Sequence, residues 1–358
     1  MSVRRLAIRL PNWVGDIMLA RPALHAIRAR WPEVALQAMA REGHLALVER
    51  LGLFERIDAA PASGALASAL TVRRAARAVR AFAPDAVVLL APSFEAALVA
   101  RLAGVPRRIG HDTDGRGRLL TDAVPPRPEA HRSDEYLELA SSLGAADDTP
   151  GERRGDPVPP LALTGADREF GARLIREMGW PRDCRPVFVN PAAAKVPRAW
   201  SSDRYRALVE HLAARSLDGG PPIIVHARLP FEAPDDWARA HGVALAGDAT
   251  LPELAALLER CALYVGNDSG PAHLAAAAGI PTVSLYGSSR AFRTGPAAPG
   301  GAPHIPVSAE FDCSPCRERF FEECPSPPTD DGRPPCLDAI ATDSVVQTVD
   351  RILSRDSP

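Results

Sequence analysis

The first half of the chain alternates short apolar runs with longer amphipathic stretches. The short runs are bounded by polar or turn residues and predict strands at Arg4–Leu10, Val34–Ala40, Asp85–Ala91 and Arg107–Gly110. Apolar residues recur at helical spacing over Ile17–Trp31, Gly43–Leu51, Leu66–Phe82 and Phe94–Ala103. Strands that alternate with helices predict a parallel sheet covered on both faces.

The second half repeats this alternation. It predicts strands at Pro186–Asn190, Pro222–Ala227, Ala262–Gly266 and Thr282–Tyr286. Helices are predicted at Ala166–Met178, Asp203–Arg215, Pro252–Arg260, Pro271–Ala278 and Asp343–Leu353. The Pro- and charge-rich stretch 125–160, interrupted by a helix-like segment at 133–143, is the best linker candidate, and 288–335 is expected to be mostly loop.

This alternation predicts an α/β protein of two Rossmann-like, doubly wound domains that face a central cleft. We expect residues 1–160 to form the first domain and residues 161–358 the second, with the last helix, 343–353, able to pack back on the first. Folds of this class bind ligands at the carboxyl ends of their strands. Neither half has a G-x-G-x-x-G turn after its first strand, which argues against a hydride-transfer enzyme.

Composition narrows the class of protein. The 358 residues suit two domains, and 46% hydrophobic with 24% charged residues excludes global disorder. The net charge of −2 argues against a dedicated nucleic-acid binder. There is no apolar run of about 18 residues that would predict a membrane span. The N-terminus has no signal-peptide core, so we expect a cytoplasmic protein.

The turn after the first predicted strand, 11–16, is the first candidate site. Gly15 permits a tight turn, and Asp16 falls at the start of the next helix. A carboxylate there either caps the helix or takes a proton from a hydroxyl group at the mouth of the cleft. The spacing leaves both interpretations open.

Two further polar segments follow predicted strands in the second half. Segment 266–273 places Asn, Asp, Ser and His around a helix start, which offers free N–H groups to a phosphate; otherwise these side chains cap the helix and pack. Loop 190–200 carries two cations that could neutralise a leaving diphosphate, or that are solvated charges beside a packing residue, Trp200.

In this order, the N-W-V-G-D turn at 12–16, the cation-x-Trp loop ending at Trp200 and the N-D-S-G-P-A-H segment at 267–273 resemble glycosyltransferase family nine, the bacterial heptosyltransferases. More narrowly, Pro92–Leu98 followed by Ala103–Gly110 resembles the heptosyltransferase II branch of that family. The resemblance implies a GT-B fold and inverting, metal-independent transfer of heptose from ADP-L-glycero-D-manno-heptose. It also implies an acceptor in the inner core of lipopolysaccharide, presented at the inner membrane.

On the acceptor side, the resemblance makes Asp16 the general base on the acceptor hydroxyl. It also assigns acceptor contacts in the first, acceptor-binding domain to Asn12, Trp13 and Ser93. The arginine pairs 73–74 and 107–108 and the segment 116–118 could meet acceptor phosphates or an anionic membrane surface, or could be solvated charges. We include Arg107 and Arg108 among the candidate acceptor contacts.

On the donor side, the resemblance assigns the diphosphate to the second, nucleotide-sugar-binding domain, at Asp268, Ser269, Gly270 and His273. A helix start and a nearby cation can stabilise departing ADP without a metal. The family usually has lysine two residues before the loop tryptophan. Here that position is Arg198, and Lys195, the one lysine beside 41 arginines, lies three residues earlier, so either could bind phosphate.

Two donor-side features depart from the family pattern. Glu232 is a candidate ribose contact, although the turn around it lacks the glycines common there. Four cysteines follow near the end, Cys313, Cys316, Cys324 and Cys336, and could hold a structural zinc ion. Eleven residues separate the two cysteines of the second pair, rather than two to four, so we do not favour a metal there. A required cofactor is not expected.

Two other functions stay open at this point. The chain could be a family member that uses another sugar donor or acceptor. It could also be a non-catalytic protein that binds a nucleotide sugar on the same scaffold. Asp16 discriminates the second alternative, because only a transferase needs a base on the acceptor hydroxyl.

Overall fold

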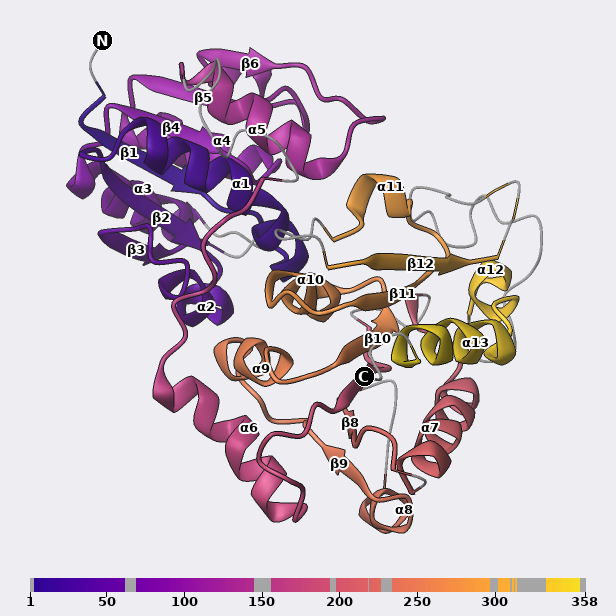
Figure 1. Cartoon of the computed structure of the whole chain (residues 1–358). Coiled ribbons are helices and arrows are strands. Elements are labelled where there is room, and N and C mark those ends of the chain that lie inside the picture. Colours follow the sequence, from indigo (N-terminus) through magenta and orange to yellow (C-terminus); the bar gives the residue numbers. More distant parts are fainter. Residues whose placement is uncertain are drawn as a thin grey trace. The chain divides into compact units, whose positions relative to one another are not determined.

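The computed structural model describes residues 3–61, 69–144, 156–193, 198–217, 219–226, 234–296, 302–309, 311, 313 and 333–354. The chain divides into two compact units, Met1–Ala162 and Leu163–Pro358 (Figure 1). Each unit is built around its own parallel sheet. None of the described helices is long and apolar enough to span a bilayer.

The sheet of the first unit has six parallel strands in the order β3-β2-β1-β4-β5-β6. Their bounds are β1 Arg5–Arg9, β2 Ala35–Ala40, β3 Arg56–Ala59, β4 Ala86–Leu89, β5 Arg107–His111 and β6 Asp122–Val124. The strand order reverses between β1 and β4, which pair in register from Leu6 with Ala86 to Arg9 with Leu89. In sheets of this order, ligands bind at that switch point, beyond the carboxyl ends of the strands.

Helices cover this sheet. They are α1 Val14–Arg30, α2 Leu45–Glu49, α3 Ala69–Phe82, α4 Phe94–Ala103 and α5 Arg132–Ser142, with 3-10 turns η1 Glu42–His44 and η2 Gly117–Leu119. One core joins α3 and α4 to the sheet face that presents Ala7, Met39 and Val87. Helix α5 packs along α1, and the amide of Ala162 donates to the Arg50 carbonyl. Much of the predicted linker therefore belongs to the first unit.

The second unit repeats the order, β12-β11-β10-β7-β8-β9, in six parallel strands. Their bounds are β7 Val187–Asn190, β8 Ile223–Val225, β9 Val243–Leu245, β10 Leu263–Asn267, β11 Thr282–Tyr286 and β12 His304–Ser308. The switch point lies between β7 and β10, where Asn190 pairs with Gly266. Both units are thus doubly wound, as the sequence predicts.

The helices of the second unit are α6 Gly165–Glu177, α7 Ser202–Leu217, α8 Asp235–Ala240, α9 Leu251–Leu258, α10 Gly270–Ala277, α11 Ala291–Thr294, α12 Pro335–Asp338 and α13 Thr342–Leu353. The last helix, α13, packs against α7. Its buried residues Val345 and Val349 join Leu208 and Leu212 of α7 in one apolar core. That face of α13 therefore belongs to the core of the second unit.

All eight predicted strands are present, but the sequence analysis missed four others: β3, β6, β9 and β12. The first three have only three or four residues, and β3 and β6 carry charged side chains. Within the tail 288–335, which the sequence predicts to be mostly loop, the described residues include the short helix α11 and the strand β12. Strand β12 forms there because each of its residues aligns with one on β11.

Candidate functional site

In the first unit, the predicted acceptor segments lie at the switch point. The loop after β1 carries Asn12 and Trp13 and leads into α1, whose first turn contains Asp16. The loop after β4 carries Ser93, at the N-cap of α4. Because β1 and β4 are parallel neighbours, both loops leave the sheet at the same edge. The structure therefore brings these four residues to the edge where folds of this class bind ligands.

Asp16 is held by helix α5. The hydroxyl of Tyr136 donates to Oδ1 of Asp16 at 3.3 Å, and Nε of Arg132 lies 3.8 Å from the same oxygen. Tyr136 is buried, and burial followed by the Asp16 charge raises its pKa well above the ordinary value, so its hydroxyl stays protonated. The Asp16 side chain is 27% exposed and can reach a bound hydroxyl group.

The other predicted acceptor residues differ in what they contact. Asn12 accepts a hydrogen bond from the Arg9 guanidinium at 2.7 Å. Trp13 is 56% exposed, with the Arg41 guanidinium 5.8 Å from its ring centroid. The Ser93 hydroxyl accepts from the Ala96 amide at 3.3 Å and thereby caps α4.

The predicted arginines take structural positions in this unit. Arg107 and Arg108 begin β5, so they lie at the opposite edge of the sheet from Asp16. Arg107 forms an ion pair with Asp122 at 3.0 Å, and Arg108 donates to the Leu119 and Val105 carbonyls. As acceptor contacts they stay a prediction. The surface role considered for Arg116 is wrong, because that side chain is fully buried and donates to backbone carbonyls.

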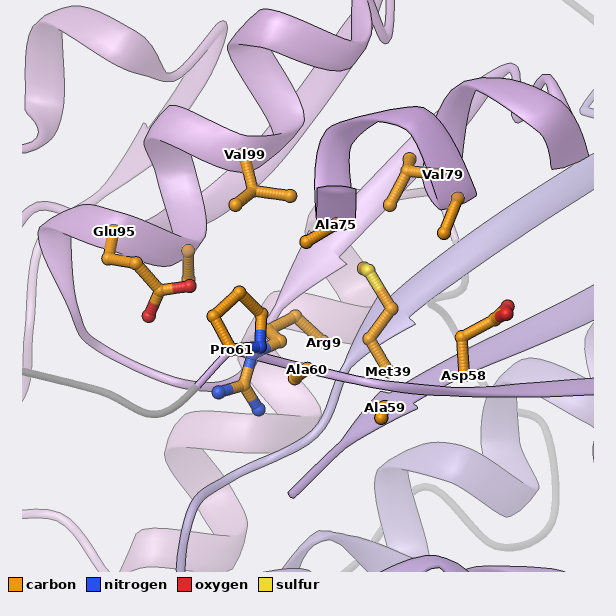
Figure 2. A pocket seen from close by; sticks show the side chains of 12 residues that line it. Arg9, Met39, Asp58, Ala59, Ala60, Pro61, Ala75, Val79, Glu95 and Val99 are labelled. Atoms are coloured by element: carbon orange, nitrogen blue, oxygen red, sulfur yellow. The ribbon is translucent and has the colours of Figure 1, made fainter. Parts of the chain in front are cut away.

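A small pocket that is open to solvent lies in the first unit, between the ends of β1–β3 and helices α3 and α4 (Figure 2). Figure 2 shows the Arg9 guanidinium and the Glu95 carboxylate on one side of it and Met39, Val79 and Val99 among the apolar side chains. The pKa of Glu95 is raised above its ordinary value, because the effect of burial exceeds the opposing effect of the Arg9 charge. Arg9 joins this pocket to the loop after β1 through Asn12.

In the second unit, two asparagines at strand ends organise the switch point. Asn190, the last residue of β7, donates through Nδ2 to the Tyr264 hydroxyl at 2.9 Å and to Ser269 Oγ at 3.1 Å, and its Oδ1 accepts from His226 Nδ1 at 2.8 Å. Asn267, the last residue of β10, accepts from the Trp200 amide and donates to the Pro191 carbonyl. These bonds join loop 190–200 to the start of α10.

The start of α10 is suited to an anion. Ser269 is its N-cap, but its hydroxyl contacts Asn190 and Tyr264, so among the described residues no side chain caps the helix. The first backbone N–H groups of α10 form the positive end of the helix dipole and can donate hydrogen bonds to an anion. Gly270 and buried His273 lie in the first and second turns. The structure therefore brings the predicted donor residues 268–270 and 273 together.

Arg198 and Asp268 form an ion pair beside this helix start. Arg198 Nη2 donates to Asp268 Oδ2 at 2.9 Å, and Ser289 also donates to that oxygen. Asp268 is nearly buried, whereas a quarter of the Arg198 side chain is exposed. Trp200 is buried in the core of the second unit, which confirms the packing interpretation for this residue.

Several predicted residues lie outside the described part of the chain: Lys195, Glu232, Cys316 and Cys324. Of the other two cysteines, Cys313 is partly buried and Cys336 is buried. Among the described residues, no group of three or more His, Cys, Asp and Glu side chains could hold a metal ion. The structure therefore leaves the cysteine site as a prediction.

The sequence analysis missed the residues that hold Asp16, and in the second unit it missed Ser289 beside Asp268 and His226 and Tyr264 beside Asn190. Arg132, Glu135 and Tyr136 have the i, i+3, i+4 spacing of one helix face, which was a readable signal for a shared site. Ser289, His226 and Tyr264 have no such signal, because they come from separate loops and strands that only the sheet brings together.

Two doubly wound units with polar switch points have the architecture of a GT-B glycosyltransferase. Solved structures match this chain over nearly its whole length. The structure of E. coli ADP-heptose lps heptosyltransferase II matches with a TM-score of 0.73 and 20% sequence identity, and the match covers 98% of this chain and 99% of that chain. The structure of the glycosyl transferase family 9 protein from Veillonella parvula DSM 2008 matches with a TM-score of 0.78 and 20% sequence identity, and the match covers 99% of this chain and 98% of that chain. At this identity the likeness shows the fold.

Sequence comparison gives the family. The profile of glycosyltransferase family 9 (heptosyltransferase) matches residues 72–324, which include α5 and segment 266–273 but begin after Asp16. Lipopolysaccharide heptosyltransferase 2 of Escherichia coli K12 is 27% identical over 300 residues, covering 78% of this chain and 81% of the relative. The chain belongs to glycosyltransferase family 9, the heptosyltransferases.

Proposed function

We propose that this chain is an inverting heptosyltransferase that moves heptose from ADP-L-glycero-D-manno-heptose to the inner core of lipopolysaccharide, like heptosyltransferase II. The observation that carries the proposal is the placement of a base candidate and an anion-binding helix start at the two switch points, one in each unit. The names of the relatives supply ADP-heptose as the donor and lipopolysaccharide as the acceptor; the heptose isomer and the inner core are what the family resemblance implies. We assign the acceptor to the first unit and the nucleotide sugar to the second.

The reaction follows from the chemistry of the two sites. The acceptor oxygen attacks C1 of the heptose while the bond between C1 and the phosphate oxygen breaks, and the electron pair leaves with ADP. Asp16 takes the proton of the acceptor hydroxyl as the new bond forms. Attack from the side opposite the leaving group inverts the configuration at C1. The acceptor contacts in this proposal are Asn12 and Trp13, in the loop that leads to Asp16, and Ser93, in the loop after β4.

On the donor side, the first amides of α10 and Ser269 bind the diphosphate as its negative charge grows. Arg198 adds a cation at the same place, and Asp268 holds the Arg198 guanidinium in position at 2.9 Å. Helix amides and a guanidinium can offset the charge of departing ADP, which supports a metal-independent reaction. The role of His273 at the diphosphate rests on the family motif alone. Lys195 as a second phosphate contact and Glu232 at the ribose stay predictions, because the sequence departs from the family motif at both places.

The first unit also supports peripheral contact with the cytoplasmic face of the inner membrane. Helix α3 buries Val72, Ala75, Ala76 and Val79 and exposes Arg73, Arg74, Arg77 and Arg80 with Leu70. Each basic residue near an anionic membrane contributes about 1 kcal/mol. Sedimentation with vesicles containing anionic lipid tests this: retention that disappears at high salt supports it, and no retention at low salt contradicts it.

The substitution Asp16→Asn tests the transferase. It keeps the size and a hydrogen-bonding side chain but removes the base, so we expect transfer to fall by at least a hundredfold, within the usual range for a general base. ADP affinity, measured by calorimetry, should stay within about twofold, because the donor residues lie in the other unit. Unchanged turnover would overturn the role of Asp16. ADP-heptose binding without turnover on any core acceptor would favour a non-catalytic binding protein.

A further inference from the structure

Two side chains on one face of α5, Tyr136 and Arg132, contact the proposed base, and a third, Glu135, contacts Arg132. Tyr136 donates to Asp16 Oδ1 at 3.3 Å, and Arg132 Nε lies 3.8 Å from that oxygen. Arg132 also donates through Nη1 to Glu135 Oε2 at 2.9 Å. Arg132 thus stands between two carboxylates, one of which is proposed to be the base.

We propose that Tyr136 and the Arg132–Glu135 ion pair are positioning residues that hold Asp16 in place and set the basicity of its carboxylate. This inference rests on the proposed function for its consequence in turnover. The effect on the Asp16 carboxylate itself can be measured without it.

The Glu135 carboxylate limits how strongly Arg132 acts on Asp16. Glu135 is buried and also accepts from the Arg127 amide at 3.1 Å, so its position is fixed. Burial opposes the charged form of Arg132, but Tyr136, Asp16 and Glu135 together raise its pKa. A guanidinium that is shared with Glu135 at 2.9 Å attracts Asp16 less than an unshared one would. Asp16 therefore keeps more basicity than a carboxylate that alone pairs with an arginine.

Tyr136 acts in the same direction as Arg132. A hydroxyl donor stabilises the charged carboxylate and lowers its pKa. Because burial raises the pKa of Tyr136, the hydroxyl remains a donor at neutral pH and does not compete as a base. Buried His111 faces Glu135, and burial lowers its pKa, so it adds no charge at neutral pH. Arg132 of α5 is a charged group in direct contact with Asp16.

Two substitutions should move the pKa of Asp16 in opposite directions. Tyr136→Phe removes a donor and should raise the pKa of Asp16 by about 1–2 units, the effect of one hydrogen bond to a charged group. Glu135→Gln releases Arg132 toward Asp16 and should lower it by a similar amount, within the range of an added opposite charge. Glu138→Gln is the matched control: it removes a charge from the same helix, and Glu138 lies 4.0 Å from Arg127 in an ion pair. It should leave the pKa unchanged.

The first test is an NMR pH titration of the ¹³C-labelled aspartate carboxyls in the full chain, with the Asp16 signal assigned by its loss in Asp16→Asn. Opposite shifts in Tyr136→Phe and Glu135→Gln support the inference. Shifts in the same direction, or none, in folded proteins overturn it. If Glu135→Gln does not fold, the double substitution Arg132→Gln with Glu135→Gln removes the ion pair as a unit and should raise the pKa of Asp16; no rise would contradict the inference.

The pH profile of kcat is the second test. Activity requires ionised Asp16, so its acid limb should move to higher pH in Tyr136→Phe and to lower pH in Glu135→Gln, with KM for ADP-heptose unchanged. A weaker base should also lower the plateau of kcat severalfold in Glu135→Gln. NMR shifts without matching kinetic shifts would refute Asp16 as the base and leave the positioning of its carboxylate intact. If both the acid limb of the kcat profile and the NMR pKa of Asp16 stay unchanged in the two variants, the positioning role of the α5 residues is refuted.

Discussion

Arg116 gives the sharpest stability prediction. Its side chain is fully buried, and it donates to the His111 carbonyl at 2.9 Å and to the Ala91 carbonyl at 2.5 Å, with longer bonds to Ser93 and Leu89. These acceptors come from the carboxyl ends of β4 and β5 and the loop after β4. Arg116 therefore ties together the edge of the sheet beside the proposed acceptor site.

The substitution Arg116→Met keeps the length of the side chain and removes its donors. Burial lowers the pKa of Arg116 to about 10, so losing the charge relieves some desolvation. Against that gain stand two short bonds from a charged donor, each worth about 1.5–3 kcal/mol, and carbonyls left without this donor in the interior. The net loss should be about 2–3 kcal/mol in the free energy of unfolding, a large effect for one substitution.

Urea unfolding followed by circular dichroism measures this loss, and the melting temperature should fall by about 5–10 °C for a unit of this size. Arg118→Met is the matched control, because Arg118 lies two residues away in the same turn and is exposed. It should change stability by less than about 0.5 kcal/mol. Equal losses in the two variants, or none in Arg116→Met, would refute the assignment of Arg116 to the interior.

Other substitutions test the second unit, the acid response and the donor loop. Gly266→Ala would place a Cβ 2.5 Å from Tyr264 Oη and 2.8 Å from the Asn190 carbonyl oxygen, so we expect a loss of about 1–3 kcal/mol in urea unfolding; unchanged stability would contradict this packing. Burial and the Arg21 charge lower the pKa of His25 from 6.5 to about 4. His25 thus favours the folded state fully above pH 6.5, and this contribution, roughly 1–2 kcal/mol between pH 7 and pH 5, is lost as pH falls toward 4 and should be absent in His25→Gln. Arg198→Ala should weaken ADP binding about tenfold in calorimetry, since it removes a charge-assisted contact; if neither it nor Lys195→Ala weakens binding, the loop does not bind phosphate.

The fold could be predicted where strands are buried on both faces. The run 86–91 is continuously apolar, and the helices around such strands have a clear period. The strands at 56–59 and 122–124 could not be found this way, because they are short and carry Arg56, Asp58 and Asp122. They form because a neighbouring strand in the sheet offers unpaired backbone groups.

The candidate site could be predicted only as far as local motifs reach. Asp16 and segment 268–273 follow strands directly, and their place at the switch points follows from topology. Tyr136 lies 120 residues from Asp16 along the chain, so no local pattern shows their contact. The sequence predicts the arginine-rich segment 116–118 to lie on the surface, but Arg116 is buried and donates to backbone carbonyls. A sequence does not show which carbonyls a buried guanidinium will contact.

The most direct test of the proposed function is heptose transfer by the purified full chain. ADP-L-glycero-D-manno-heptose is incubated with lipopolysaccharide core acceptors that carry or lack the first heptose, and the products are analysed by mass spectrometry and by NMR of the new anomeric centre. We predict one added heptose, on the acceptor that already carries the first, with the anomeric configuration inverted relative to the donor. Retained configuration would contradict the in-line mechanism at Asp16. Absence of transfer to both acceptors would contradict the proposed activity.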